Sequence, residues 1–283
     1  MTLLRPLRGH GGDRSGCYAG DPDAPDVRTW EAAERPKRHR TAERCDEDRG
    51  AKFGPAPWLP PPRGSYTGRM AIQILTIESA PFAENSYVVW REGGTEAFVI
   101  DPGFEPDLIR EALADRGLTL AAIVCTHGHV DHIAGNTDLK RAFPDAPIYI
   151  GTRDAAFLTD PVVNMSAAFG FSVTSPPADH LVNEGDKITA AGIELEVFDI
   201  PGHSPGHVVY LIREMKPLVV LGGDVLFRGS VGRTDFPGGS FPLLRAGIER
   251  VLWPLPPDTV VYPGHGPVTT VGHEKKTNPF LMD

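Results

Sequence analysis

This 283-residue sequence has little cysteine, no long hydrophobic run and no excess of positive charge. Its three cysteines, Cys17, Cys45 and Cys125, are too few for a disulfide framework. No apolar segment has the length of a transmembrane helix, and the N-terminus lacks the apolar core of a signal peptide. These absences argue against a disulfide-stabilised secreted protein and against a membrane protein, so we expect a cytoplasmic location.

Residues 1–69 differ in composition from the remainder of the chain. They hold nine prolines, 13 Lys and Arg and 10 Asp and Glu, and they show no sustained apolar periodicity. Such a segment cannot bury enough apolar surface to fold, so we predict that it is disordered. Met70 stands directly before the first predicted strand, and a second interpretation is that residues 1–69 are a mis-assigned extension. Residues 70–283 suffice for one catalytic domain with a full core.

The charge of the predicted domain limits its partners. The whole chain has a net charge of −9 and residues 1–69 contribute +3, which leaves −12 on residues 70–283. Nucleic-acid binding depends on Lys and Arg that neutralise phosphates. We therefore expect a small-molecule substrate and neither a nucleic acid nor a membrane as partner, and the sequence leaves the oligomeric state open.

Short strands alternate with amphipathic helices along the domain. The β-branched and aromatic segments 72–77, 86–90 and 97–100 have the pattern of a strand meander. Apolar residues recur at helical spacing in 106–116, from about 132 to 142, and in 241–252. This alternation predicts an α/β or α+β layered domain.

Four potential metal ligands follow the apolar run 121–125. They are His127, His129, Asp131 and His132, within the segment Thr-His-Gly-His-Val-Asp-His. Imidazole nitrogens and carboxylate oxygens are ligands that zinc and iron accept. So many polar groups at the end of a strand need a compensating partner. The segment predicts the floor of a site that can hold two cations.

Three further ligands occur later, and each comes after an apolar strand and small turn residues. His203 follows 193–200, Asp224 ends the run 218–224, and His265 comes after Tyr-Pro-Gly. Glycine and proline form the turns that let a strand end carry a side chain toward a shared centre. The repeated pattern predicts that all three join the first cluster.

This ligand set resembles the signature of the metallo-β-lactamase superfamily, over a stretch from about residue 70 to the C-terminus. The segments 222–227, 232–239 and 274–280 are similar to single-domain glyoxalase II-like hydrolases. The resemblance implies an αββα sandwich of two mixed β-sheets flanked by helices. It also implies one metal held by His127, His129 and His203, a second held by Asp131, His132 and His265, and Asp224 as the bridge between them.

The resemblance further implies hydrolysis of thioesters such as S-2-hydroxyacylglutathione by a metal-bound hydroxide. Two divalent ions would be the cofactors, with zinc favoured and iron or manganese as alternatives. Asp131 and Asp224 are the expected catalytic carboxylates. Arg233 is expected either to contact the substrate or to form a salt bridge with Asp235. The His207 ring is expected to hydrogen-bond a ligand and fix its orientation.

Other functions fit the same residues. A persulfide dioxygenase would use one iron held by His127, His203 and Asp224, a two-histidine, one-carboxylate arrangement. Another metallo-hydrolase or a metal-binding protein without catalytic activity is a further alternative. The thiol carrier is also open, because the two-domain glyoxalase II enzymes contact glutathione through a helical domain that would follow the His265 region.

Overall fold

The computed structural model describes residues 70–282, and the predictions for residues 1–69 lie outside this range. The described chain contains two six-stranded sheets and one short hairpin. The first sheet has the order β1-β2-β3-β4-β5-β6. Its strands are β1 (Ile72–Ser79), β2 (Glu84–Arg91), β3 (Glu96–Ile100), β4 (Thr119–Val124), β5 (Ile148–Gly151) and β6 (His180–Val182).

The second sheet has the order β14-β13-β10-β9-β8-β7. Its strands are β7 (Lys187–Ala190), β8 (Ile193–Asp199), β9 (Val208–Ile212), β10 (Val219–Gly223), β13 (Val260–Pro263) and β14 (Thr269–Thr270), and the hairpin is β11 (Leu226–Phe227) and β12 (Ser230–Val231). Both sheets are mixed, because β3 pairs parallel to β4 and β10 pairs parallel to β13, while other pairs are antiparallel.

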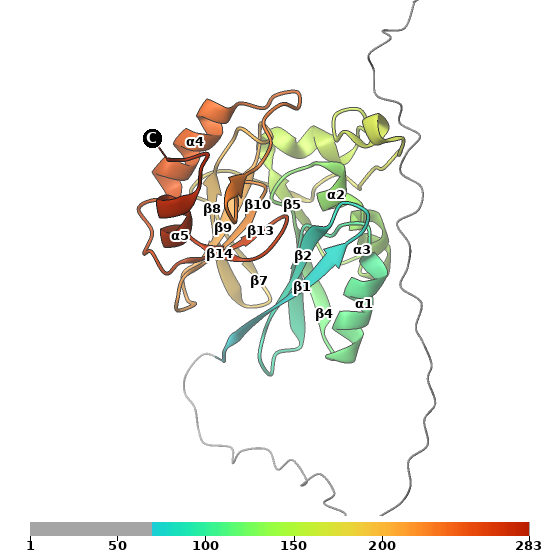
Figure 1. Ribbon diagram of the computed structural model, residues 1–283. Coiled ribbons are helices and arrows are strands. Elements are labelled where there is room, and N and C mark those ends of the chain that lie inside the picture. Colours follow the sequence, from blue (N-terminus) through green and yellow to red (C-terminus); the bar gives the residue numbers. More distant parts are fainter. Residues whose placement is uncertain (1–69, 283) are drawn as a thin grey trace, which may run out of the picture. The chain divides into compact units, whose positions relative to one another are not determined.

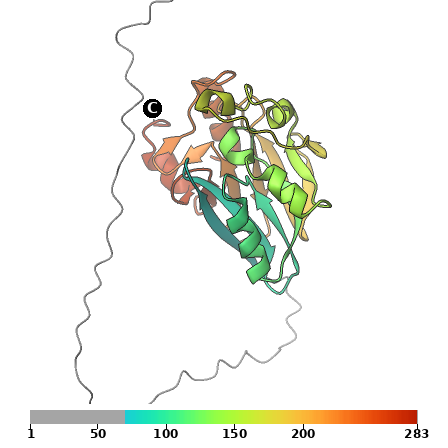
Figure 2. The same ribbon diagram turned by 90° about the vertical axis from the view of Figure 1, so that its right-hand side faces the viewer.

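The helices lie on the two outer faces of these sheets and at one end of them (Figure 1, Figure 2). They are α1 (Pro106–Asp115), α2 (Val130–Ile133), α3 (Asn136–Ala142), η1 (Thr152–Leu158), η2 (Ser166–Phe169), α4 (Phe241–Val251) and α5 (Val271–Thr277). In Figure 1, α1 and α3 lie beside the first sheet, whereas α4 and α5 lie beside the second. Within the described residues, no helix combines the length and apolar character needed to cross a lipid bilayer.

The alternation of side chains along the strands produces three apolar layers. In β2, Val88 packs in the cluster that contains the α1 and α3 residues, and Val89 packs in the cluster between the sheets. In β9, Tyr210 faces the first sheet, while Leu211 belongs to the cluster with α4 residues such as Leu244. Successive side chains of a strand point to opposite faces, so each central strand contributes side chains to two hydrophobic clusters. This arrangement confirms the predicted αββα sandwich.

One predicted helix is wrong in its boundaries. The sequence pattern indicated a single helix from about His132 to Ala142, but the structure has α2 and α3 separated at Ala134 and Gly135. The Gly135 amide donates to the Pro102 carbonyl at 2.9 Å. A Cβ at position 135 would lie 2.7 Å from the Gly103 oxygen. The close approach of the loop after β3 therefore interrupts the helix.

Candidate metal centre

The seven predicted ligands converge at one edge of the sandwich, because each lies where a strand ends or where α2 begins. His127 and His129 lie after β4, His203 after β8, Asp224 after β10 and His265 after β13. Asp131 and His132 lie in the first turn of α2. Two groups of ligand atoms result, His127 with His129 and His203, and Asp131 with His132 and His265. These are the two groups that the sequence resemblance implies.

The first group consists of three buried imidazoles. The Nε2 atom of His203 lies 3.1 Å from Nε2 of His127 and 2.8 Å from Nδ1 of His129. Burial lowers the pKa of His129 to about 3 and that of His203 to about 4. Burial also lowers the pKa of His127 well below its ordinary value. The rings are therefore neutral at physiological pH and offer lone pairs to a cation.

The second group joins two imidazoles to a carboxylate. His265 Nε2 lies 3.2 Å from Asp131 Oδ2, and His132 Nε2 lies 3.8 Å from the same oxygen. Burial alone would lower the pKa of His132, but Asp131 and Asp224 raise it well above its ordinary value. Burial alone would raise the pKa of Asp131, but His132 and His265 lower it below its usual range. A carboxylate held ionised beside two imidazoles is a typical donor set for a divalent ion.

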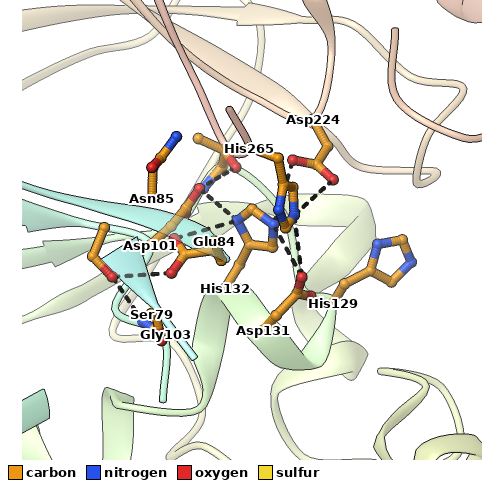
Figure 3. A network of polar contacts seen from close by, with 12 residues as sticks. Ser79, Glu84, Asn85, Asp101, Gly103, His129, Asp131, His132, Asp224 and His265 are labelled. Atoms are coloured by element: carbon orange, nitrogen blue, oxygen red, sulfur yellow. Dashed lines mark hydrogen bonds and ion pairs between the residues drawn. The ribbon is translucent and has the colours of Figure 1, made fainter. Parts of the chain in front are cut away.

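Asp224 lies between the two groups. Its Oδ1 is 3.4 Å from His132 Nε2, and its Oδ2 is 3.4 Å from His203 Nε2 and 3.6 Å from His265 Nε2. One carboxylate therefore reaches both groups of ligand atoms, as a bridging ligand must. Figure 3 shows Asp224 and Asp131 near the His132 and His265 rings.

Buried atoms without partners test whether the site fits metal ions. Among the described residues, His132 Nε2 and Asp224 Oδ1 are buried and have no hydrogen-bond partner. An unsatisfied buried polar atom costs about 1–3 kcal/mol. Burial also raises the pKa of Asp224, which means that its ionised form is destabilised in the protein alone. A cation between these two atoms would satisfy both, so the residues fit divalent metal ions.

The outer nitrogens of the ligand rings are held by acceptors. His203 Nδ1 lies 2.8 Å from the Arg233 carbonyl oxygen, and His265 Nδ1 lies 3.2 Å from that of Ala83. His132 Nδ1 lies 3.0 Å from Asp101 Oδ2. Each acceptor receives a hydrogen bond from the outer N–H, and this bond orients the ring so that the inner nitrogen points into the site.

Asp101 is a functional residue that the sequence analysis missed. Besides His132, it accepts the Thr126 amide and the Thr126 hydroxyl, both at 2.6 Å. Figure 3 shows it on the side of His132 opposite Asp131. Its position directly after β3 follows the same pattern of a strand followed by an acidic residue that identified Asp224, so the sequence held a signal for it.

Asp154, in η1, was also missed, and it joins two ligand-bearing loops. Its buried carboxylate accepts the Gly206 amide and the Ser204 hydroxyl at 2.6 Å and the Gly128 amide at 3.2 Å. Gly128 lies between His127 and His129, and Ser204 follows His203. Asp154 therefore sets the distance between the two loops. It stands in no local motif, so nothing in its own segment indicated this role.

His207 and Arg233 lie beside the predicted ligands and have partners of their own. His207 Nε2 accepts the backbone amide of Asp224 at 3.0 Å, and its ring stacks on His127 with 4.7 Å between centroids. It thus holds the main chain of a ligand rather than a ligand side chain. Arg233 donates to both carboxylate oxygens of Asp235, at 2.7 and 2.8 Å, at the rim of a pocket that opens onto the ligands. Substrate contact by Arg233 stays a prediction.

Comparisons with known proteins agree with this geometry. Residues 79–265 match the model of the metallo-beta-lactamase superfamily. The hydroxyacylglutathione hydrolase GloC of Haemophilus influenzae is 35% identical over 75% of this chain and 98% of its own length. The B3 metallo-beta-lactamase BLEG-1 is 39% identical, with a TM-score of 0.71 over 75% of this chain and all of its own.

A third similar protein bears on the metal. TTHA1623, solved in a di-iron-bound form, is 39% identical, with a TM-score of 0.65 over 73% of this chain and all of its own. The family match and the two ligand groups together imply divalent metal ions, and the di-iron form belongs to that similar protein. The chain is therefore a metallo-hydrolase that belongs to the metallo-beta-lactamase superfamily.

Proposed function

We propose that this chain is a metal-dependent thioester hydrolase of the glyoxalase II type, acting on S-2-hydroxyacylglutathione or a related thioester. The observation that carries the proposal is the complete pair of ligand groups with Asp224 reaching both. The 35% identity to a hydroxyacylglutathione hydrolase over nearly its whole length supports this substrate class. Zinc is the metal that we favour, with iron or manganese as alternatives.

The metal ions and the residues that hold them have different roles in the proposed reaction. When bound, a pair of divalent ions lowers the pKa of water toward neutrality and polarises a carbonyl group. His127, His129 and His203 would hold one ion, and Asp131, His132 and His265 the other, with Asp224 between them.

Two carboxylates, Asp131 and Asp224, line the pocket. Because the pKa of Asp131 is held below its usual range, this carboxylate is ionised at neutral pH and suits an anionic ligand of the second ion. Asp101, His207 and Asp154 keep the ligands oriented through the bonds described above.

The direct test is hydrolysis of S-D-lactoylglutathione by the metal-replete, full-length protein. We expect turnover that collapses in His129→Ala, because this variant removes one ligand of the first group. Metal content and circular dichroism of both proteins establish that the variant is folded. Absence of turnover with this substrate would exclude S-D-lactoylglutathione, and absence of turnover with larger 2-hydroxyacyl thioesters as well would contradict the proposal.

A second candidate is a mononuclear-iron persulfide dioxygenase. The specific observation in its favour is that His203 Nε2 lies within 3.1 Å of His127 Nε2 and 3.4 Å of Asp224 Oδ2, so the three ligands of such a site are adjacent. His129→Ala distinguishes the two functions, because the dioxygenase would keep its three ligands. Oxygen consumption with glutathione persulfide that persists in this variant would favour the second candidate over the first.

The similarity to BLEG-1 raises a third reaction, the opening of a β-lactam ring. The same preparation should therefore be assayed with a chromogenic β-lactam. We expect slow or no turnover relative to the thioester, because Asp224 as a bridging carboxylate belongs to the glyoxalase II-like ligand set. A β-lactam turnover that exceeds the thioester turnover would assign the chain to the lactamases instead.

A further inference from the structure

The pocket above the predicted ligands has apolar side walls, and these side chains have no role in the proposed hydrolysis. Its volume is about 330 Å³, and its floor holds His129, Asp131, His203, Asp224 and His265. The walls are mostly apolar, and they include Phe82, Met165, Phe169, Phe227, Val231 and Phe236. These six side chains come from the β1–β2 turn, the segment around η2, the β11–β12 hairpin and the loop before α4. Four separate parts of the chain thus place apolar surface around one opening.

Aromatic rings extend from the mouth of this pocket to the ligands. Phe82 and Phe169 meet edge to face at 5.4 Å between centroids, and Phe169 lies 6.5 Å from Phe236. Phe236 in turn lies 5.3 Å from His129. On the other side, Phe227 lies 6.0 Å from His265. If the carbonyl carbon of a substrate lay beside the predicted metal ligands, a side chain bonded to that carbon would contact these aromatic rings directly.

The segment that carries Phe169 is held in place by its own hydrogen bonds. The Asn164 side chain donates to the carbonyls of Phe157 and Val173 at 3.0 Å and accepts the Ser166 amide at 2.9 Å. The Asn164 carbonyl accepts the amide of Val130, in α2, at 3.0 Å. Phe169 is nevertheless 45% exposed, on a segment whose backbone is fixed. Exposed apolar surface that lines a concave site is typical of a binding surface.

The pocket offers little to a charged substituent. Apart from histidine, Arg233 is the one cationic residue among those that line it. Both ends of its guanidinium donate to Asp235, and the group lies over the Phe236 ring at 3.9 Å. Asp235 neutralises the charge of this guanidinium, which weakens its attraction for a substrate carboxylate. Charged groups are costly to bury between apolar walls without such a partner.

We propose that this pocket is a subsite for a large apolar group on the acyl side of the substrate, with Phe169 and Phe236 as its contacts. The inference rests on the proposed function and narrows its substrate class to 2-hydroxyacyl thioesters with an alkyl or aryl side chain larger than methyl. A polar thiol carrier such as glutathione, which bears carboxylates and an ammonium group, extends toward solvent instead. The walls then bury the acyl side chain, and selectivity grows with the apolar area buried.

The test is a series of glutathione thioesters that differ only in the acyl side chain. The 2-hydroxyacyl group carries methyl, propyl, pentyl or benzyl, and kcat/KM is measured with the full-length, metal-loaded protein. We expect kcat/KM to rise by about threefold to fourfold per added methylene until the pocket is filled. In Phe169→Ala, the preference for pentyl over methyl should fall by about tenfold.

Phe171→Ala is the matched control. This residue is an exposed ring on the same segment, in contact with Phe82 and Phe104, but it does not line the pocket. Its removal should leave both the methyl rate and the side-chain preference unchanged. An equal loss of preference in both variants would show that the effect comes from the segment as a whole and would contradict the assignment of Phe169 to the subsite.

A binding measurement separates failure of this inference from failure of the proposed function. Calorimetry with the free 2-hydroxy acids of the same series needs no turnover. Tighter binding and a more negative heat-capacity change with larger side chains support the subsite even if no thioester is hydrolysed. If thioesters were hydrolysed but neither kcat/KM nor the binding affinity changed with the size of the side chain, the inference would be overturned. The proposed hydrolase function would then still stand.

Discussion

Gly264 lies against two of the predicted metal ligands. A Cβ at this position would lie 2.2 Å from Asp224 Oδ1 and 2.7 Å from His132 Cε1. We predict that Gly264→Ala displaces the Asp224 carboxylate and lowers kcat/KM by about 100-fold, because a displacement of about 1 Å has an effect of this size. Bound metal per chain, measured by elemental analysis, should fall as well.

Gly266→Ala is the control for this prediction. Gly266 has a φ of +73°, so alanine is strained there, but a Cβ would meet no atom within 4 Å. The variant should lose some stability and keep its metal and its activity. Equal losses of activity in both variants would mean that backbone strain in this turn, rather than contact with Asp224, causes the effect.

Residue identity alone indicated the cluster of seven predicted ligands, whereas the residues that hold them in place were harder to find. Histidine and aspartate after an apolar strand are conspicuous because such groups need a partner when buried. Asp154 is also a buried aspartate, but its partners are two backbone amides and a serine hydroxyl from distant loops. A role that depends on partners far away in sequence leaves no local pattern around the residue itself.

At the scale of elements, β2 holds the turn that carries His265. The Asn85 amide donates to the Gly264 carbonyl at 2.7 Å, and its side chain donates to the carbonyls of Pro263 and Gly266 at 3.1 and 2.8 Å. We predict that Asn85→Ala loosens this turn and weakens metal binding at the group of Asp131, His132 and His265 by about tenfold. Titration with a chelator that competes for the metal measures the two affinities separately.

Tyr87→Phe provides a graded comparison. The Tyr87 hydroxyl donates to the same Pro263 carbonyl at 2.5 Å, but this variant removes one bond and leaves the Asn85 contacts in place. Its effect on the second metal affinity should be smaller than that of Asn85→Ala. If only the affinity of the other group, with His127, His129 and His203, were to change in Asn85→Ala, the assignment of this contact would be wrong.

The strands and long helices were predictable because their signals are local. The predicted ranges 72–77, 97–100 and 106–116 match β1, β3 and α1 to within a few residues. The break between α2 and α3 was not predictable, since its cause is the loop after β3, more than thirty positions away from Gly135 in the sequence. For the same reason, the order of the strands within each sheet could not be derived from the residue pattern.

At the scale of the whole molecule, buried histidines should make the metal-free protein sensitive to acid. The pKa of His129 lies at about 3 and that of His203 at about 4, and burial holds those of His127 and His207 well below the ordinary value of 6.5. The unfolded chain binds protons near pH 6.5, whereas the folded chain does not. The free energy of unfolding therefore falls as the pH drops from about 6.5 toward 4.

Each of these four rings contributes a slope of up to about 1.4 kcal/mol per pH unit. His132 and His265, whose pKa values their carboxylate neighbours raise, act in the opposite direction, as do Glu84, Asp154 and Asp224, whose pKa values burial raises, and these groups reduce the net slope. Urea unfolding of the metal-free protein at pH 7 and pH 4.5 measures the difference, and the metal-loaded protein should be more stable at pH 7. A stability that is constant over this range would contradict the prediction.

The contact between β2 and the His265 turn has a consequence for protein synthesis. The ribosome adds His127 to His132 well before Asp224 and His265. The turn that carries His265 is fixed only when Gly264 can pair with Asn85. A nascent chain thus carries two of the three residues of each ligand group until His203 completes the first, and the second stays incomplete until His265 is added. We therefore expect hydrolytic activity to appear only after translation has passed His265, and copies that terminate earlier to be inactive.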